Sequence, residues 1–470
     1  MPTAQHHRDY PPGPGLRLLA EQALSRAAGA PLQAGNAVEL LIDGARHFEA
    51  WAALIESARH YVLLENYIIA DDTVGRRFRD LLIARAQAGV QVCLVHDWFG
   101  TFGNAGRAFF APLHKAGVAV RAFNPPRAAA PLAWIGRDHR KLLVVDGHSG
   151  SISGVCVAAK WLGDSARGVP PWRDTGVLIR GPAVADIEAA FRSSWGEMGT
   201  ALDVPSAAPA PACGEVALRV VASQPAHGAM YRLDSLIAAM ATRTLWIADA
   251  YFVGVPTYVR GLAAAAADGV DVRLLVPGNN NLPAVAALSR AGYRPLLEAG
   301  IRVFEWNGSM MHAKTAVADG RWARVGSSNL NLSSWLANHE LDAAIEDENF
   351  AAHMQAQYER DLGQATELLL AGRRARPQAL PPRASRGGSS SRAAAGALRL
   401  ANTMGAAIAG RRVLAESERG VLSLGGIALV LLALLAIWLP QVLAWPLAVL
   451  LGWLGLSLLW RRWHGDAPRP

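Results

Sequence analysis

The hydrophobic positions of this chain form a pattern that occurs twice. Apolar runs of strand length occur at 61–69, 89–97 and 116–123 (YVLLENYII, GVQVCLVHD, AGVAVRAF). Their counterparts are LWIADAYFV at 245–253, GVDVRLLVP at 269–277 and AGIRVFEW at 299–306. Each set predicts three strands with a helix between successive strands, followed by a further buried strand. This alternation predicts an α/β fold with a largely buried sheet, built by duplication.

The repeat and the changes of composition divide the 470 residues into segments. A linker at 197–214 is indicated by LDVPSAAPAPAC, which is rich in proline and alanine. The predicted segments are a tail with a short helix (1–35), a first domain (36–196), that linker, a second domain (215–368), a basic flexible linker (369–415), a membrane hairpin (416–463) and a tail (464–470).

The most specific polar feature is a short motif at matching positions of the two halves. HRKLLVVD at 139–146 and HAKTAVAD at 312–319 each place a Lys two residues and an Asp seven residues after a His. A second landmark ends seventeen residues after each His, SGVC at Cys156 and GSSN at Asn329. The motif residues are His139, Lys141, Asp146, His312, Lys314 and Asp319. One such motif arises easily by chance, whereas two copies with matched second landmarks indicate one composite active site.

The motif residues have the chemistry that cleavage of a phosphodiester needs. Side chains two apart on a strand share a face, so each His projects beside its Lys. One imidazole can attack phosphorus while the other protonates the departing alcohol, and two ammonium groups stabilise the charge on the phosphate oxygens. We expect further hydrogen bonds to phosphate from the hydroxyls of Ser327 and Ser328 and the amide of Asn329. No metal ion and no cofactor are predicted, because the lysines supply the positive charge.

These motifs and their flanking phrases resemble the phospholipase D superfamily and, within it, the bacterial cardiolipin synthases. The phrases are NAVELLIDGARHFEAWAALIESARHYVLLENYI at 36–68, DTVGRRFRDLLIARAQAGVQV at 72–92, WRDTGVLIRGPAVADIEAAFRSSW at 172–195 and RLANTMGAAIAGRRVL at 399–414. The resemblance covers most of residues 36–365. It implies two duplicated phospholipase D-like α/β/α domains related by a pseudo-twofold axis, with one shared active site.

The resemblance also implies roles for the histidines. One His becomes a covalent phosphohistidine, and the other acts as general acid and then as general base. By this analogy His139 is the nucleophile and His312 the acid and base, an order that the pseudosymmetry leaves open. An imidazole needs a carboxylate on its far nitrogen to fix its tautomer. We expect Asp174 in WRDTGV and Glu340 in NHELDAA to be these carboxylates, since each precedes an apolar strand in its own half.

Three other positions of the motifs have different expected roles. Asp146 and Asp319 complete the motifs, but they stand five residues past each Lys, which favours a structural hydrogen bond at a strand end. Cys156 stands where the second half has Asn329 and where the family usually has Asn. A thiol cannot donate as an amide does, so we expect one phosphate contact of the first half to be missing or supplied by water. Cys156 itself is expected to be a small packed residue.

Charge separates the C-terminal part of the chain from the rest. The whole chain carries +8, residues 373–412 hold nine arginines and no Asp or Glu, and residues 413–470 carry a net +1. Residues 1–372 therefore carry about −2. The basic segment contains PPRASRGGSSSR, which is typical of a flexible linker. We expect this segment to lie against an anionic membrane surface.

Two apolar runs of 19 residues, 421–439 and 442–460, follow the basic segment and contain no Asp, Glu, Lys, Arg or His. Each approaches the roughly 20 residues that span a bilayer as a helix. Tryptophans stand near the ends of both runs, as interfacial aromatic residues do: Trp438, Trp445, Trp460 and Trp463. We therefore expect a C-terminal transmembrane helical hairpin, with a re-entrant hairpin as the alternative. Arginines flank both outer ends, which places the catalytic domains on the cytoplasmic side of a bacterial inner membrane.

Other features agree with a cytoplasmic location of the catalytic part. The N-terminal residues lack the apolar core of a signal peptide. The three cysteines (Cys93, Cys156 and Cys213) are too few and too scattered for a disulfide framework or a zinc site. A reducing compartment fits this usage.

We expect a phosphatidyltransferase that makes cardiolipin from two phospholipids. Phosphatidylglycerol is the expected donor and acceptor, and phosphatidylethanolamine is an alternative for one of them. The rival within the superfamily is phospholipase D hydrolysis to phosphatidic acid, because the same histidines serve when water is the acceptor. A nuclease is disfavoured, and no nucleic-acid partner is expected, because residues 1–372 lack the basic balance that nucleic acid requires. A non-enzymatic scaffold is disfavoured because both His/Lys pairs are present.

Overall fold

The computed structural model describes residues 14–126, 136–205 and 209–370, together with a few helical positions between 434 and 456. The described residues of 14–125 and 136–370 belong to one compact unit, and residue 126 with the few described positions between 434 and 456 to a second. The basic segment lies outside the described residues, as do the two apolar runs apart from those few positions. In the part of the chain that is described, no helix has both the length and the apolarity needed to cross a membrane.

The first half of the compact unit follows an N-terminal helix, α1 (Pro14–Ala28). Its strands are β1 (Gln33–Ile42), β2 (Tyr61–Asn66), β3 (Gln91–Asp97), β4 (Ala119–Phe123), β5 (Lys141–Val145), β6 (Ser149–Ser153) and β7 (Thr175–Arg180). Its helices are α2 (Asp43–Ser57), α3 (Thr73–Gln87), α4 (Trp98–Thr101), α5 (Arg107–Lys115) and α6 (Val184–Glu197), with the 3-10 turns η2 (Ala159–Trp161) and η3 (Ser165–Arg167).

The second half repeats this arrangement of strands and helices. Its strands are β8 (Val216–Ser223), β9 (Thr244–Ala248), β10 (Asp271–Pro277), β11 (Arg302–Trp306), β12 (Thr315–Ala318), β13 (Trp322–Gly326), β14 (Glu340–Glu346) and β15 (Ala365–Leu368). Its helices are α7 (Ala229–Met240), α8 (Pro256–Ala267), α9 (Pro283–Ala291), α10 (Tyr293–Glu298), α11 (Leu332–Leu336) and α12 (Glu348–Leu362).

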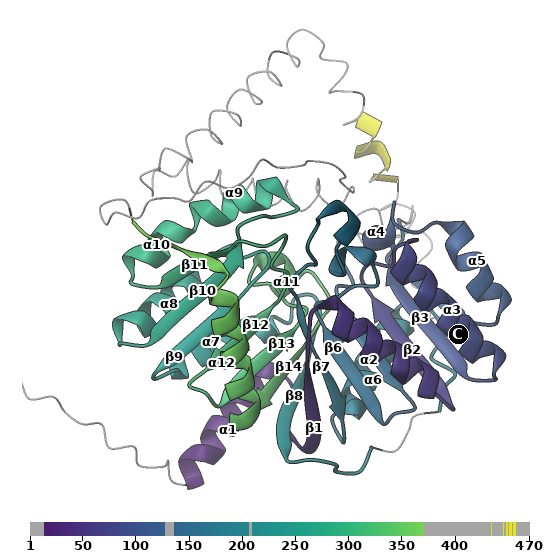
Figure 1. Ribbon diagram of the computed structural model, residues 1–470, viewed down its shortest axis with the longest axis horizontal. Helices are drawn as coiled ribbons and strands as arrows, with labels where there is room; N and C mark the ends of the chain where they lie inside the picture. The colour runs from purple at the N-terminus through teal and green to yellow at the C-terminus, as the bar shows by residue number, and fades with distance from the viewer. Residues whose placement is uncertain are drawn as a thin grey trace, which may run out of the picture. The chain divides into compact units, whose positions relative to one another are not determined.

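The strands of both halves join in one 15-stranded sheet, in the order β15-β11-β10-β9-β12-β13-β14-β8-β1-β7-β6-β5-β2-β3-β4 (Figure 1). From the central antiparallel pair of β1 and β8, both halves have the same order of seven strands outward, and the second half adds β15 at its edge. The predicted α/β fold and its duplication are confirmed. The apolar pattern predicted three strands ahead of each motif strand, whereas the structure has one more in each half, β1 and β8. These two additional strands join the halves.

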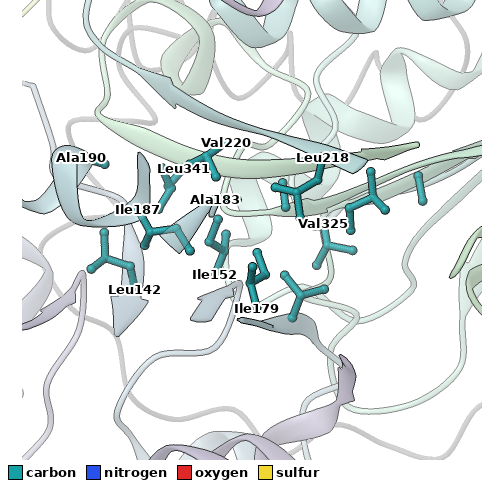
Figure 2. Close-up of a cluster of buried hydrophobic side chains, with 14 of the residues drawn as sticks. Leu142, Ile152, Ile179, Ala183, Ile187, Ala190, Leu218, Val220, Val325 and Leu341 are labelled. Atoms are coloured by element: carbon teal, nitrogen blue, oxygen red, sulfur yellow. The ribbon is translucent and has the colours of Figure 1, made fainter. Parts of the chain in front are cut away.

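The interior consists of three apolar clusters, one of which belongs to both halves. Side chains alternate across each strand, so Leu142 and Val144 of β5 face the shared cluster, while Leu143 and Val145 face a cluster of the first half alone. Figure 2 shows side chains of both halves meeting in the shared cluster. Helices α6 and α12 cover this side of the sheet. Burial of this common core holds the two halves, and therefore the two motifs, in one relative position.

Candidate active site

The segment that leads into each motif strand is hydrogen-bonded to the other half of the molecule. The backbone N–H of His139 donates to the carbonyl of His339 at 2.8 Å. The backbone N–H of His312 donates to the carbonyl of Arg173 at 2.7 Å. These bonds belong to two isolated parallel bridges, Asp138 with His339 and Arg173 with Met311. Each motif His is therefore placed next to the residue that precedes the other half's candidate carboxylate.

Each imidazole is paired with the carboxylate of the opposite half. His139 Nδ1 lies 2.8 Å from Glu340 Oε2, and His312 Nδ1 lies 2.7 Å from Asp174 Oδ2. An ionised carboxylate only accepts hydrogen bonds, so Nδ1 carries the proton in both pairs and Nε2 keeps its lone pair. The structure thus brings all four predicted residues together, in a crossed arrangement that the sequence analysis did not specify. This tautomer leaves Nε2 as the nucleophilic or basic atom of each ring.

Both carboxylates are fully buried, and further donors hold them in place. The indole Nε1 of Trp161 donates to Asp174 Oδ2 at 2.8 Å. Ser327 Oγ donates to Glu340 Oε2 at 2.6 Å, and Asn338 Nδ2 to Oε1 at 3.2 Å.

The pKa values of these carboxyl groups reflect two opposing effects. Burial acts to raise the pKa of Asp174, but the facing His312 and its hydrogen bond hold that pKa well below its ordinary value. Burial likewise opposes the effect of His139 on Glu340, and the pKa of Glu340 is lowered as well. Both groups are therefore ionised at neutral pH, as the tautomer assignment requires.

The two motif lysines are fully buried beside the histidines. Lys141 Nζ donates to the carbonyl of His139, and Lys314 Nζ donates to that of His312. Each ammonium has three donors, so two N–H groups of each remain for a ligand. Burial lowers the pKa of Lys141. Burial, opposed by Asp174 and assisted by the charge of Lys141, lowers the pKa of Lys314 to about 8.

The same charges favour neutral imidazoles. Burial lowers the pKa of His139 despite the facing carboxylate of Glu340. Burial and the Lys314 ammonium, whose Nζ lies 3.1 Å from His312 Nδ1, lower the pKa of His312 to about 3. In addition, the charge of Lys314 lowers the pKa of His139, and the charge of Lys141 lowers that of His312. Both imidazoles and both ammonium groups therefore share one electrostatic environment.

Two tyrosines pack against the histidines at equivalent positions, and the sequence analysis missed them. The ring of Tyr67 lies 4.8 Å from that of His139, with Lys141 Nζ 5.1 Å from its centroid. The ring of Tyr251 lies 5.8 Å from that of His312. A signal was present in the sequence, because each tyrosine is the seventh residue of the repeated runs YVLLENY and LWIADAY. Each ring packs against one side of a motif histidine, and its π face attracts the ammonium group of the neighbouring lysine.

The expectation that Ser327 and Ser328 bind phosphate is wrong in this arrangement. Each hydroxyl has a single proton, and the structure directs it to a carboxylate: Ser327 to Glu340 and Ser328 to Asp342. Both serines are fully buried. The amide oxygen Oδ1 of Asn329 has no hydrogen-bond partner among the described residues, but an oxygen only accepts, so a phosphate oxygen would be bound by its Nδ2 amide.

Asp146 and Asp319 lie at the far ends of the motif strands and are not among the groups that contact the histidines. The carboxylate of Asp146 accepts the backbone N–H groups of Arg59, His60 and Tyr61 at 2.7–2.8 Å. The carboxylate of Asp319 accepts those of residues 242–244 at 2.7–2.9 Å. Although both residues belong to the motifs, these contacts are the structural hydrogen bonds at a strand end that their spacing favours. They tie each motif strand to the turn that enters the neighbouring strand.

Cys156 is buried in the apolar cluster of the first half, and burial raises the pKa of its thiol. The charge of Lys141 opposes this rise of the pKa. The thiol offers no amide group to a ligand. Within residues 14–126, 136–205 and 209–370, no group of three or more His, Cys, Asp or Glu side chains is placed to hold a metal ion.

Comparison with known proteins agrees with this geometry. The family model described as "Cardiolipin synthase, PLD-like domain" matches residues 236–362. Cardiolipin synthase A of Pseudomonas aeruginosa is 34% identical over 359 residues, which cover 75% of this chain and 72% of that protein. Cardiolipin synthase 1 of Bacillus anthracis is 29% identical over 360 residues, covering 74% and 70%.

Solved structures show the same fold at low sequence identity. Phosphatidylserine synthase of Haemophilus influenzae matches 74% of this chain and 92% of its own, with a TM-score of 0.60 and 14% identity. Fold and site together define an enzyme of the phospholipase D superfamily. The sequence relatives narrow this: the chain belongs to the cardiolipin synthase family of that superfamily.

Proposed function

We propose that this enzyme is a phosphatidyltransferase that makes cardiolipin and free glycerol from two molecules of phosphatidylglycerol. The observation that carries the proposal is the crossed pair of His–carboxylate contacts, which orients two imidazoles in one lysine-rich site. The names of the sequence relatives support the class of reaction. Exchange of one phosphodiester for another needs no nucleotide.

The first step forms a phosphatidyl-enzyme. His139 Nε2 attacks the phosphorus of one phosphatidylglycerol, and the bond from phosphorus to the glycerol oxygen breaks. His312 gives its Nε2 proton to that oxygen, so glycerol leaves as a neutral alcohol. In the second step His312, now neutral, takes the proton of a hydroxyl on a second phosphatidylglycerol. The resulting oxygen attacks phosphorus, the P–N bond to His139 breaks, and cardiolipin is released.

The electrostatics of the site favour a neutral nucleophile and make protonation of the acid depend on bound substrate. A nucleophilic imidazole must be neutral, and burial favours that form of His139. A general acid must be protonated, whereas the lowered pKa of His312 leaves it neutral in the free enzyme. The negative charge of a bound phosphodiester opposes the effect of the lysines, so substrate binding raises this pKa. Binding of the substrate thus favours protonation of His312.

We further propose that the apolar runs 421–439 and 442–460 anchor the enzyme in the bacterial inner membrane as a hairpin. The basic segment 373–412 would then bind anionic headgroups, and the catalytic unit would face the cytoplasm. An active site held against the bilayer favours a lipid alcohol over water as acceptor. The few described positions within these runs are helical and exposed, among them Trp445, Val449 and Leu456.

The test is product analysis with the full chain in vesicles of phosphatidylglycerol labelled in its glycerol headgroup. The proposal predicts cardiolipin and released glycerol in equal amounts. Phosphatidic acid without cardiolipin would refute the transferase and establish hydrolysis. Replacing part of the phosphatidylglycerol by phosphatidylethanolamine identifies the donor, because ethanolamine then appears among the released alcohols.

A further inference from the structure

A third lysine lies beside the site and belongs to neither motif. Lys160, in the turn η2, has its Nζ 4.8 Å from the ring centroid of Trp161 and 4.6 Å from that of Trp172. Lys160 and Trp172 are half-buried, while Trp161 is fully buried. A cation held against two indole faces is kept in one place while it still reaches the surface.

Both indoles that hold Lys160 also contact His312. The ring centroids of Trp161 and Trp172 lie 5.3 Å and 5.4 Å from that of His312. The backbone just before Trp172 is tied to the second half, since Ser309 Oγ donates to the carbonyl of Pro171 at 2.6 Å. Lys160 is therefore positioned relative to the imidazole that activates the acceptor hydroxyl.

The charge of Lys160 reaches the interior of the site. Burial dominates the raised pKa of the Cys156 thiol, but Lys141 and Lys160 both oppose it. Lys141 and Lys314 donate to the carbonyls of the two motif histidines, and the proposed function assigns their remaining N–H groups to the reacting phosphate. Lys160, held by the two indoles and not by a motif histidine, can serve a second anion without competing for the first.

This third cation occurs on one side of the pseudo-twofold axis only. Cys156 corresponds to Asn329, so Lys160 corresponds to Ser333 in α11. The chain from Cys156 to Asp174 is also seven residues longer than the chain from Asn329 to Glu340. The extra length includes the turn η3 and leads to Trp172. The positive charge of Lys160 thus lies with His312.

We infer that Lys160, held by Trp161 and Trp172, binds the phosphodiester of the acceptor phospholipid, the one that does not react. This inference rests on the proposed function. An acceptor phosphatidylglycerol carries its own phosphate at the far end of the three-carbon glycerol that bears the attacking hydroxyl. When that hydroxyl lies at His312 Nε2, its phosphate requires a cation a short distance beyond the imidazole. Water and simple alcohols lack this anion, so Lys160 selects for transfer to a phospholipid.

The experiment measures how the phosphatidyl-enzyme partitions between acceptors. The full chain is incubated in mixed micelles of neutral detergent and phosphatidylglycerol with 1-butanol present. The ratio of cardiolipin to the sum of phosphatidylbutanol and phosphatidic acid depends only on the acceptor step. Lys160→Met keeps the apolar stem and removes the charge, whereas Lys160→Arg keeps the charge. Ser333→Ala is the matched control at the equivalent position of the other half.

Loss of one charged contact to phosphate is expected to lower this ratio roughly tenfold or more in Lys160→Met. The ratio should stay within about threefold of the unmodified enzyme in Lys160→Arg and be unchanged in Ser333→Ala. The summed rate of all products should fall much less than the ratio. An equal loss of all products would overturn the inference, because Lys160 would then act only by supporting Trp161 and His312. An unchanged ratio would overturn it too. Absence of cardiolipin from the unmodified enzyme would instead refute the proposed function, and this inference with it.

Discussion

The two halves of the catalytic unit share a backbone plan but support their carboxylates differently. Asp174 receives an indole N–H from Trp161, whereas Glu340 receives the hydroxyl of Ser327 and the amide of Asn338. The residue before Asp174 is Arg173, which forms a bidentate ion pair with Asp361.

The residue before Glu340 is His339, whose Nε2 lies 3.1 Å from Glu197 at the end of α6. The arginine is permanently charged, whereas the histidine is charged only when protonated. The His312 imidazole is therefore backed by an arginine–carboxylate pair, and the His139 imidazole by a histidine–carboxylate contact. The reacting groups therefore occupy equivalent positions in the two halves, but the residues that support them differ.

The interiors of the halves differ in the same way. At equivalent positions of β6 and β13, Ser151 accepts the indole N–H of Trp51, whereas Arg324 is paired with Asp234 at 2.8 Å. Both members of this ion pair are buried, and Asp342, which binds Ser328, also acts on Arg324. The second half thus connects a buried charge network to its landmark loop, and the first half has neutral groups there. Equal folds do not require equal polar interiors.

The largest expected loss of activity comes from replacing either motif histidine, and the two replacements should differ in the step that they block. His139→Ala and His312→Ala should each reduce cardiolipin synthesis at least about 10²–10⁴-fold, because each removes a group that moves protons or attacks phosphorus. A donor lipid with a p-nitrophenyl leaving group needs no protonation. His312→Ala should therefore still release a burst of nitrophenol from this donor, and His139→Ala should not. A burst only in the His139 variant would reverse the two roles.

Each carboxylate variant should show the same kind of defect as a variant of the histidine that it contacts in the opposite half. Glu340→Gln is expected to behave like a defect in His139, with no burst from the activated donor. Asp174→Asn is expected to behave like a defect in His312, with the burst retained. Each change disturbs a tautomer, so turnover of phosphatidylglycerol should fall by roughly 10²–10⁴-fold. If each change instead matched the histidine of its own half, the crossed arrangement would be wrong. Thermal melting of both variants controls for loss of fold.

The polar interiors predict unequal losses of stability. Arg324→Met leaves Asp234 buried without its partner, which should destabilise the fold by about 3 kcal/mol. Trp51→Phe removes one hydrogen bond to Ser151 and should cost about 1 kcal/mol. The shifts of the urea midpoint, with unchanged slope, measure both effects. Similar shifts would show that the buried charge of the second half adds nothing that the neutral pair lacks.

A smaller effect is expected in the dependence of kcat/KM on pH. The pKa of Lys314 is lowered to about 8, and an ammonium carries its charge below its pKa. In the free enzyme this charge is therefore lost as pH rises through about 8, and kcat/KM should fall by up to about tenfold per pH unit above that value. Lys314→Arg keeps its charge throughout this range and should remove the alkaline limb at reduced overall activity. An unchanged limb in that variant would assign the titration to another group.

Much of the site was predictable from sequence because its signals are local. The two-residue spacing predicts His139 beside Lys141 and His312 beside Lys314, although both histidines precede the strands β5 and β12, and the repeat shows that both sets belong to one duplicated unit. Asp174 and Glu340 were predictable from their positions ahead of apolar strands. Tyr67 and Tyr251 were equally visible in the repeat, but nothing in their spacing indicated chemistry.

The pairing of these groups was decided by the tertiary structure alone. His139 meets Glu340 across 201 positions of the chain, and His312 meets Asp174 across 138. Contacts at such separations depend on sheet order and on the shared core, neither of which has a local sequence signature. The same holds for Ser327, whose hydroxyl proton goes to a carboxylate, and for Lys160, which a long connection carries to His312. Sequence alone thus determined which chemical groups are present and which of them are close neighbours along the chain, while the fold determined which of them act on one another across the two halves.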